Sequence, residues 1–304
     1  MRIDLLLIIS YACLLTCKVS KPQTTQQQLT PLLTAIVVSD IQNSSQWFEE
    51  KLGFKFKEVI KDYPKHNLKV GVMEINGFYL ELVENVAAVP QNELPIPDDT
   101  NLNGYSKLGF MVNDIELLYA HLKKFNDVDF LTDVGTLPPS NLPIQWPSNY
   151  LLIRDPDGNM IQFFSQNDVA RGDMNMKPWL VGITVSNLDS VSLWYRKHLG
   201  FKHINTIGEA GNRRNIIALD GFVLELFEPS NVLLYNTLEE PQEYLGIRKL
   251  SFGTPNFDDF SSLIENPSID YVFPPDSTSS AWASRSMIIL DNEGNWVQIF
   301  DTNL

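Results

Sequence analysis

Apolar and polar positions in the first part of the chain follow one clear order of elements. Leu32–Val38 is a continuous apolar run, which predicts a buried strand. From Ile41 to Leu52 the apolar residues recur at helical spacing, and Gly53 is placed to end that helix. Three strands are expected next, the last two joined at Asn76-Gly77, a dipeptide typical of tight hairpins. Their ranges are Phe54–Ile60, Lys69–Ile75 and Phe78–Val83. The segment is therefore predicted to be a βαβββ unit.

The same order returns three more times along the chain. New units open with the apolar strands Lys107–Val112, Leu180–Val185 and Lys249–Gly253. Each is followed by a segment of helical spacing, namely Ile115–Phe125, Val191–Leu199 and Asp258–Glu265. Each unit also contains a turn signal, at Asp155–Gly158, Asp220–Gly221 and Asn292–Gly294. The segments Pro90–Asn103 and Asn231–Gln242 are expected to be loops that link units. The pattern predicts an α+β protein of four βαβββ units.

Two pairs of segments show that the four units form two similar halves. Ser39–Phe54 reads SDIQNSSQWFEEKLGF, and Ser186–Phe201 reads SNLDSVSLWYRKHLGF. Asp155–Phe163 reads DPDGNMIQF, and Asp291–Ile299 reads DNEGNWVQI. A chain of 304 residues also suits two domains of ordinary size. We expect a first domain over residues 31–168 and a second over 177–304.

The N-terminal segment indicates export. Arg2 precedes an apolar run from Leu5 to Leu15, which is too short to span a bilayer but typical of a signal-peptide core. Residues 1–20 are therefore expected to be a signal peptide, and the polar residues 21–30 a tether. Leu14–Cys17 resembles a bacterial lipoprotein box, so Cys17 is the lipidation candidate, with an ordinary cleaved signal as the alternative. Both cysteines of the chain lie in this segment, so the mature protein would have no disulfide.

Charge narrows the range of partners. The net charge of −14 argues against nucleic acid, because phosphate binding needs a basic surface. It also argues against adhesion to an anionic membrane surface, which leaves a lipid anchor as the expected membrane contact. The protein is expected in the cell envelope, either periplasmic or lipid-anchored, with secretion as the alternative.

The repeated motifs resemble a known family. A strand ending in Asp, a helix with paired aromatic residues, Leu-Gly-Phe and a Gly-x-x-x-Glu-Leu strand resemble the glyoxalase/bleomycin-resistance/dioxygenase group, the vicinal oxygen chelate superfamily. DPDGNMIQF resembles the closing motif of the same fold. The resemblance implies two glyoxalase-like domains whose mixed sheets curl into cups that hold a ligand. A fold of this kind supports many chemistries, so function must be argued from the site.

The resemblance also implies where metal ligands would lie. Metal enzymes of the family take ligands from the first and last strands of each unit, usually His and Glu. The matching first-strand residues here are Leu33, Lys107, Leu180 and Lys249. The matching last-strand residues are Glu81, Gln162, Glu225 and Gln298. A divalent cation needs several His, carboxylate or thiolate ligands, so we expect neither cofactor nor metal, with a divalent metal as the alternative.

Ion pairs are expected to replace the metal. The resemblance implies that two units face each other in each cup. With the two units of one half paired, Glu81 is expected near Lys107 and Glu225 near Lys249; the sequence leaves open a swap of units between the halves. Such a pair could be only a structural replacement for a lost metal. It could also bind an anionic or carbonyl ligand, with Gln162 or Gln298 as a hydrogen-bond partner. Trp146, Trp282 and Arg285 complete the candidate ligand-binding set. The two tryptophans occupy the loop that borders the pocket mouth in the family, where they could contact a ligand or pack as a lid. Arg285, three residues after Trp282, would make the second cup more favourable for an anion. No residue is assigned a catalytic role.

Three functional hypotheses follow. The first is an exported, metal-independent protein that binds a small, anionic or carbonyl molecule. The second is a metal-dependent lyase, isomerase or dioxygenase-like enzyme with an atypical site around Glu81 or Glu225. The third is a structural envelope module without a ligand, whose cups are closed by the ion pairs.

Overall fold

The computed structural model describes residues 29–303, with gaps at 64–67, 95–96, 98–99, 139–143, 145, 167–171, 236–242, 268 and 278–284. The α-helices of this range are α1 (Ile41–Leu52), α2 (Ile115–Leu122), α3 (Leu188–Leu199) and α4 (Phe257–Ser261), and short 3-10 helices span Gln91–Glu93 and Ser262–Glu265. The first two units contain β1 (Thr30–Val38), β2 (Lys55–Tyr63), β3 (Leu68–Ile75), β4 (Phe78–Asn85), β6 (Gly104–Val112), β7 (Asp129–Phe130), β8 (Gly135–Thr136), β9 (Asn149–Arg154) and β10 (Met160–Ser165). The last two contain β11 (Met176–Thr184), β12 (Lys202–Ile207), β13 (Asn212–Leu219), β14 (Phe222–Pro229), β16 (Gly246–Thr254), β17 (Tyr271–Ser277), β18 (Arg285–Leu290) and β19 (Trp296–Asp301).

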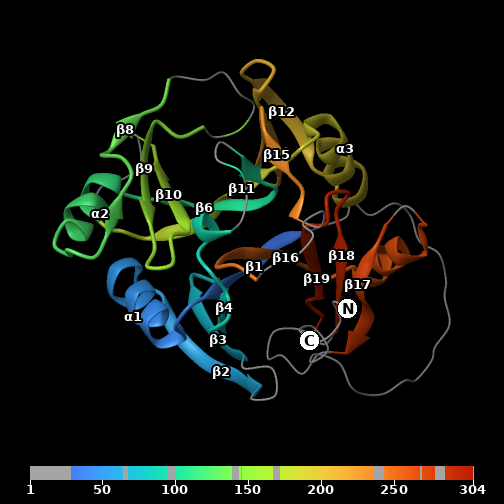
Figure 1. Ribbon diagram of the computed structural model, residues 1–304, viewed down its shortest axis with the longest axis horizontal. Coiled ribbons are helices and arrows are strands. Elements are labelled where there is room, and N and C mark those ends of the chain that lie inside the picture. Colours follow the sequence, from blue (N-terminus) through green and yellow to red (C-terminus); the bar gives the residue numbers. More distant parts are fainter. Residues whose placement is uncertain are drawn as a thin grey trace.

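The strands form two large mixed sheets, which confirms the α+β fold of paired βαβββ units (Figure 1). Sheet 1 has the order β17-β18-β19-β16-β1-β4-β3-β2, and sheet 2 has the order β12-β13-β14-β11-β6-β10-β9-β7, with β8 beside β9. Sheet 1 is joined by the antiparallel pair β1 and β16, and sheet 2 by the antiparallel pair β6 and β11. Each sheet therefore takes one unit from each half, so the expectation that the two units of one half share a cup was wrong.

Local chemistry explains why α1 and α3 lie where the periodicity predicts them. The side chain of Asp40 accepts hydrogen bonds from the backbone N–H groups of the first turn of α1, and Asn187 does the same for α3. Gly53 and Gly200 end these helices in the left-handed conformation, with φ of 75° and 78°. That conformation strongly favours glycine, and it turns each chain back into the next strand.

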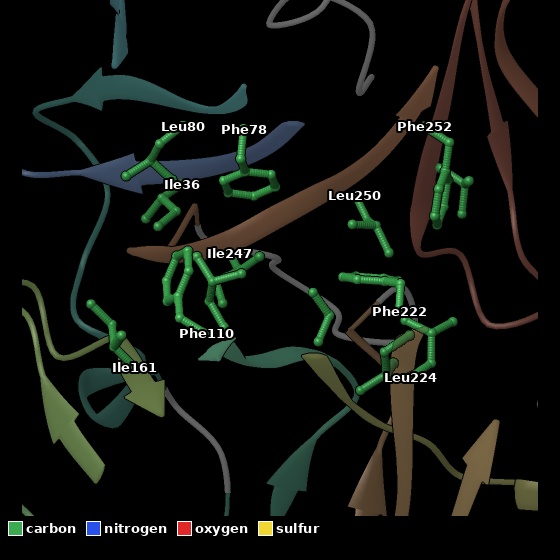
Figure 2. Packing of buried hydrophobic residues seen from close by; sticks show 14 of the residues in the cluster. Ile36, Phe78, Leu80, Phe110, Ile161, Phe222, Leu224, Ile247, Leu250 and Phe252 are labelled. Carbon is green, nitrogen blue, oxygen red and sulfur yellow. The ribbon is translucent and has the colours of Figure 1, made fainter. Parts of the chain in front are cut away.

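The main core lies on the helix-covered faces of both sheets. Figure 2 shows Phe78 of β4 beside Phe110 of β6, and Phe222 of β14 near Phe252 of β16. The ring centroids of these two pairs are 6.1 Å and 6.0 Å apart. Both pairs join two units of the same half. Each half therefore has a shared hydrophobic core, whereas each sheet is shared between halves.

The linking segments contain structure that the sequence interpretation missed. They were expected to be loops, yet β5 (Asn101–Leu102) and β15 (Val232–Leu233) pair in parallel as a small third sheet. Tyr244, Leu94 and Leu102 form a small buried cluster beside them. Contacts between these segments help to hold the two halves together.

The N-terminal predictions lie almost wholly outside the described residues. Cys17 and the expected signal peptide belong to residues 1–28, which the structure does not describe. The tether was expected to run to residue 30, but Leu29 is buried and β1 begins at Thr30. Within the described ranges, no helix is both long and apolar enough to cross a membrane.

Candidate functional site

The candidate residues of sheet 1 lie on the face opposite the helices, which we call the sheet-1 cup. Side chains alternate between the two faces of a strand. In β4, Leu80 and Leu82 face the helix-covered core, so Glu81 between them faces the cup. The same alternation places three further residues in this cup, namely Leu33, Lys249 and Gln298. The sheet-2 cup receives Lys107, Gln162, Leu180 and Glu225 by the same reasoning.

An ion pair spans the centre of each cup. In sheet 1, Nζ of Lys249 lies 3.0 Å from Oε2 of Glu81, with Ala35 on the strand between them. These side chains are only 8% and 13% exposed. In sheet 2, Nζ of Lys107 lies 2.9 Å from Oε2 of Glu225, and both side chains are 17% exposed. The pairs are therefore substantially desolvated.

The partners of these pairs differ from those expected. Glu81 was expected to meet Lys107, and Glu225 to meet Lys249, but the structure exchanges the two lysines. The physical reason is the strand order, since β1 lies between β4 and β16 in sheet 1. Each cup still contains one Leu, one Glu, one Lys and one Gln, because the two halves carry the same set.

A glycine makes room for the ion pair of sheet 2. Gly182 of β11 lies between Lys107 and Glu225 in the register of the sheet. A Cβ atom added to Gly182 would lie 2.6 Å from Cγ of Lys107, which is closer than side chains tolerate. The aliphatic part of Lys107 therefore lies directly over the glycine backbone.

Sheet 2 has a second cation that the sequence interpretation missed. Nε of Arg214, on β13, lies 3.2 Å from Oε1 of Glu225, so this carboxylate bridges two cations. The guanidinium also lies 4.2 Å from the ring centroid of Phe227. In sheet 1 the corresponding position is occupied by Val70, as the registers of the two hairpins show. Comparing the two halves at this position would have revealed the difference.

The two glutamines are in different environments. Gln298 accepts a hydrogen bond from Oγ of Ser251 at 3.5 Å and donates one to Oγ of Ser286 at 3.2 Å. In sheet 2 the corresponding positions carry Gly109 and Tyr150, which supply no such partners. Oε1 of Gln162 is buried and has no hydrogen-bond partner.

Aromatic and aliphatic side chains occupy the other end of the sheet-2 cup. Trp146 packs edge to face on Trp179 at 6.0 Å, and Trp179 packs on Phe164 at 4.7 Å. Trp179 enters the cup at a bulge of β11, which the sequence interpretation did not anticipate. These side chains belong to a second hydrophobic cluster that also includes Leu180, Ile216, Ala218 and Val223. Trp146 is thus placed at the cup, whereas Trp282 lies outside the described residues.

Arg285 does not face a cup. It shares its sheet face with Met287 and Ile289, which belong to the helix-side core. Its guanidinium pairs with Asp301 and Asp258 at 2.7 Å each and lies over Phe257. The expectation that Arg285 would attract an anion into the cup was therefore wrong, because strand alternation directs it to α4.

The donor set of each cup does not suit a divalent cation. Each contains one carboxylate and one amide, and an ammonium group occupies the position next to the carboxylate. A divalent metal requires several anionic or imidazole donors. In the part of the chain that the structure describes, no group of three His, Cys, Asp or Glu residues could hold a metal ion.

Two buried carboxyl groups lie in the turns before β10 and β19 and support the scaffold. Burial raises the pKa of Asp155 to about 7 and that of Asp291 to about 6. Each carboxylate accepts hydrogen bonds within its own turn, from Asn159 and Asn295 respectively. Asp291 also accepts a hydrogen bond from the hydroxyl group of Tyr195 at 3.2 Å.

Comparisons with known proteins agree with this architecture. Residues 30–163 match the model of the Glyoxalase/Bleomycin resistance protein/Dioxygenase superfamily. No curated protein matched the sequence. Glyoxalase I from Zea mays is similar in structure, with a TM-score of 0.63, 15% sequence identity, and coverage of 91% of this chain and 93% of that chain. A putative dioxygenase from Bacillus subtilis subsp. subtilis str. 168 has a TM-score of 0.64 at 12% identity, covering 92% of this chain and 87% of that chain. At such low identity the structural matches show the fold alone.

Proposed function

This chain belongs to the Glyoxalase/Bleomycin resistance protein/Dioxygenase superfamily, and we propose that it binds a small organic molecule in a cup without a metal ion. The observation that carries the proposal is the ion pair at the centre of each cup. A lysine ammonium group neutralises the one carboxylate that a metal could use. The cup remains lined by charged and polar groups that can orient an anionic or carbonyl compound.

The sheet-2 cup supports ligand binding better than a purely structural role. Lys107 and Glu225 are both 17% exposed, so solvent reaches them. A few polar groups beside an apolar wall are typical of small-molecule sites. Lys107 and Arg214 are the groups that would attract an anion, and Oε1 of Gln162 would accept a hydrogen bond from an O–H or N–H group of the ligand.

Metal analysis tests the metal-independent part of the proposal. The protein would be purified without chelator, and its transition-metal content would be measured by elemental analysis. We expect less than about 0.1 equivalent per chain, and no change in melting temperature on adding EDTA. Near one equivalent per chain, with a lower melting temperature after chelation, would overturn the proposal. It would favour a metal-dependent enzyme with ligands among Glu81, Gln162, Glu225 and Gln298.

We also propose that the protein is exported, on the evidence of Arg2 and the apolar run Leu5–Leu15. Mass spectrometry of the mature N-terminus would test this proposal. A lipidated Cys17 as the first residue would establish the anchor. A Cys17→Ser variant should then leave the membrane fraction, whereas an uncleaved Met1 in the cytosol would refute export.

A further inference from the structure

We propose that the sheet-2 cup, and not the sheet-1 cup, binds a small carboxylate that has an aromatic or branched apolar body and a hydroxyl or N–H donor. This inference rests on the proposed function and specifies its site and ligand class. Two differences between the cups, in charge and in an unpaired acceptor, carry it together with the apolar wall of the sheet-2 cup.

The first difference is charge. Glu225 contacts both Lys107 and Arg214, so the cluster of two cations and one carboxylate carries one excess positive charge. In the sheet-1 cup Glu81 is paired with Lys249, and Val70 replaces the arginine. A monoanion would balance the charge of the sheet-2 cluster only. Arginine and lysine at this spacing suit a carboxylate because both donate charge-assisted hydrogen bonds.

The second difference is the buried acceptor of Gln162. A buried carbonyl without a hydrogen-bond partner loses its hydration without compensation, which is unfavourable. A donor on the ligand would remove this cost after displacing the side chains that cover the amide. Gln298 has serine partners on both sides and offers no equivalent gain. The ligand is therefore expected to carry an O–H or N–H group near its carboxylate.

The third observation is the apolar wall of the sheet-2 cup. Leu180 and Gly109 lie one row beyond Gly182 and Lys107, which is two residues or about 7 Å along the strands. Trp146, Trp179 and Phe164 continue the apolar surface beyond Leu180. A ring separated from its carboxylate by one or two carbon atoms would span this distance. Its apolar body would then lie against the tryptophans while its carboxylate met the cations.

Three probes separate these contributions. 3-Phenyllactate has the carboxylate, the ring and a hydroxyl donor. 3-Phenylpropionate lacks the hydroxyl group, and 3-phenyllactamide lacks the charge. Binding to the full mature chain would be measured by calorimetry and by tryptophan fluorescence. Trp146 and Trp179 lie at the proposed site, so their fluorescence should change when the ligand binds. We expect one site per chain, and affinities for both other probes about tenfold below that for 3-phenyllactate.

Matched variants connect each contribution to a residue. Arg214→Gln should weaken 3-phenyllactate about tenfold and leave the amide unchanged. Gln162→Leu should weaken 3-phenyllactate but leave 3-phenylpropionate unchanged. Gln298→Leu is the control in the other cup, and it should leave every affinity within about twofold.

Several outcomes would overturn the inference. These are equal affinity for the acid and the amide, no effect of Arg214→Gln, or loss of binding in Gln298→Leu. Binding of none of the acids, while neutral compounds raise the melting temperature, would reject the ligand class and leave the proposed function standing. Stoichiometric metal would instead reject the proposed function itself.

Discussion

The exchanged ion pairs can be measured by a double-mutant cycle on Lys249 and Glu81. Nζ of Lys249 lies 3.0 Å from the Glu81 carboxylate, and both side chains are mostly buried. Lys249→Met keeps the length of the side chain and removes its charge. The variant leaves a desolvated carboxylate without a cation, which should cost about 3 kcal/mol of unfolding free energy. Glu81→Gln should cost a similar amount, and the coupling energy in the double variant should be about 1–3 kcal/mol.

The sheet-2 pair gives an internal comparison. Lys107→Met removes one cation, but Arg214 remains 3.2 Å from Glu225. The carboxylate keeps a partner, so the cost should be only about 1 kcal/mol. Lys107→Met is therefore expected to lose less unfolding free energy than Lys249→Met because Arg214 is present. Adding Arg214→Gln to Lys107→Met should raise the cost towards that of Lys249→Met.

Urea unfolding monitored by far-UV circular dichroism would provide the free energies, provided that the m value is unchanged among variants. The control cycle combines Lys107→Met with Glu81→Gln. These residues are in different sheets, so their coupling should be below about 0.5 kcal/mol. A larger coupling for Lys107 with Glu81 than for Lys249 with Glu81 would refute the unit pairing described above.

Three further predictions concern the scaffold. Because folding raises the pKa of Asp155 from 3.8 to about 7, the folded state binds more protons between these values, and this contribution to stability is lost as pH rises. Asp155→Asn should therefore flatten the fall in unfolding free energy between pH 4 and 7, and an unchanged pH profile would contradict the assignment. Gly182→Ala should lower stability by about 1–3 kcal/mol in urea unfolding, because the new methyl group would displace Lys107; a neutral effect would show that the lysine moves freely. Tyr195→Phe removes a buried hydrogen bond to Asp291 and should cost about 1 kcal/mol in thermal unfolding, whereas an unchanged melting temperature would show that this bond adds nothing.

Local elements were predictable because their causes are local. The helix from Ile41 to Leu52 was predicted with the observed bounds, since its apolar spacing, its cap and Gly53 lie within one segment. α2 ends at Leu122, three residues before its predicted end. α4 ends at Ser261, and a 3-10 helix over Ser262–Glu265 continues it to the predicted end. The ladder of β5 and β15 was missed because two-residue strands have no periodicity to detect.

Unit pairing could not be derived from the cup residues. Either pairing gives each cup one Leu, one Glu, one Lys and one Gln, because the halves are repeats. The choice depends on which strand lies beside β1, and β16 occupies that place with Ala35 opposite Lys249. The antiparallel pairing of β1 with β16 joins residues that are far apart in the sequence, so it cannot be predicted from any single segment. The identity of the candidate residues was thus predictable, whereas their partners required the structure.

The difference between the cups is present in the sequence, but it lies away from the positions that match the metal ligands of the family. At those positions the two halves are identical, which favoured two equivalent cups. The halves differ one step away, where Arg214 corresponds to Val70 and Gly109 to Ser251. Both changes affect the polar groups of the sheet-2 cup. Arg214 adds a cation, and Gly109 supplies no hydroxyl group to Gln162. The proposed ligand site in sheet 2 rests on these two changes, because they add the cation Arg214 beside Glu225 and leave Oε1 of Gln162 without a hydrogen-bond partner.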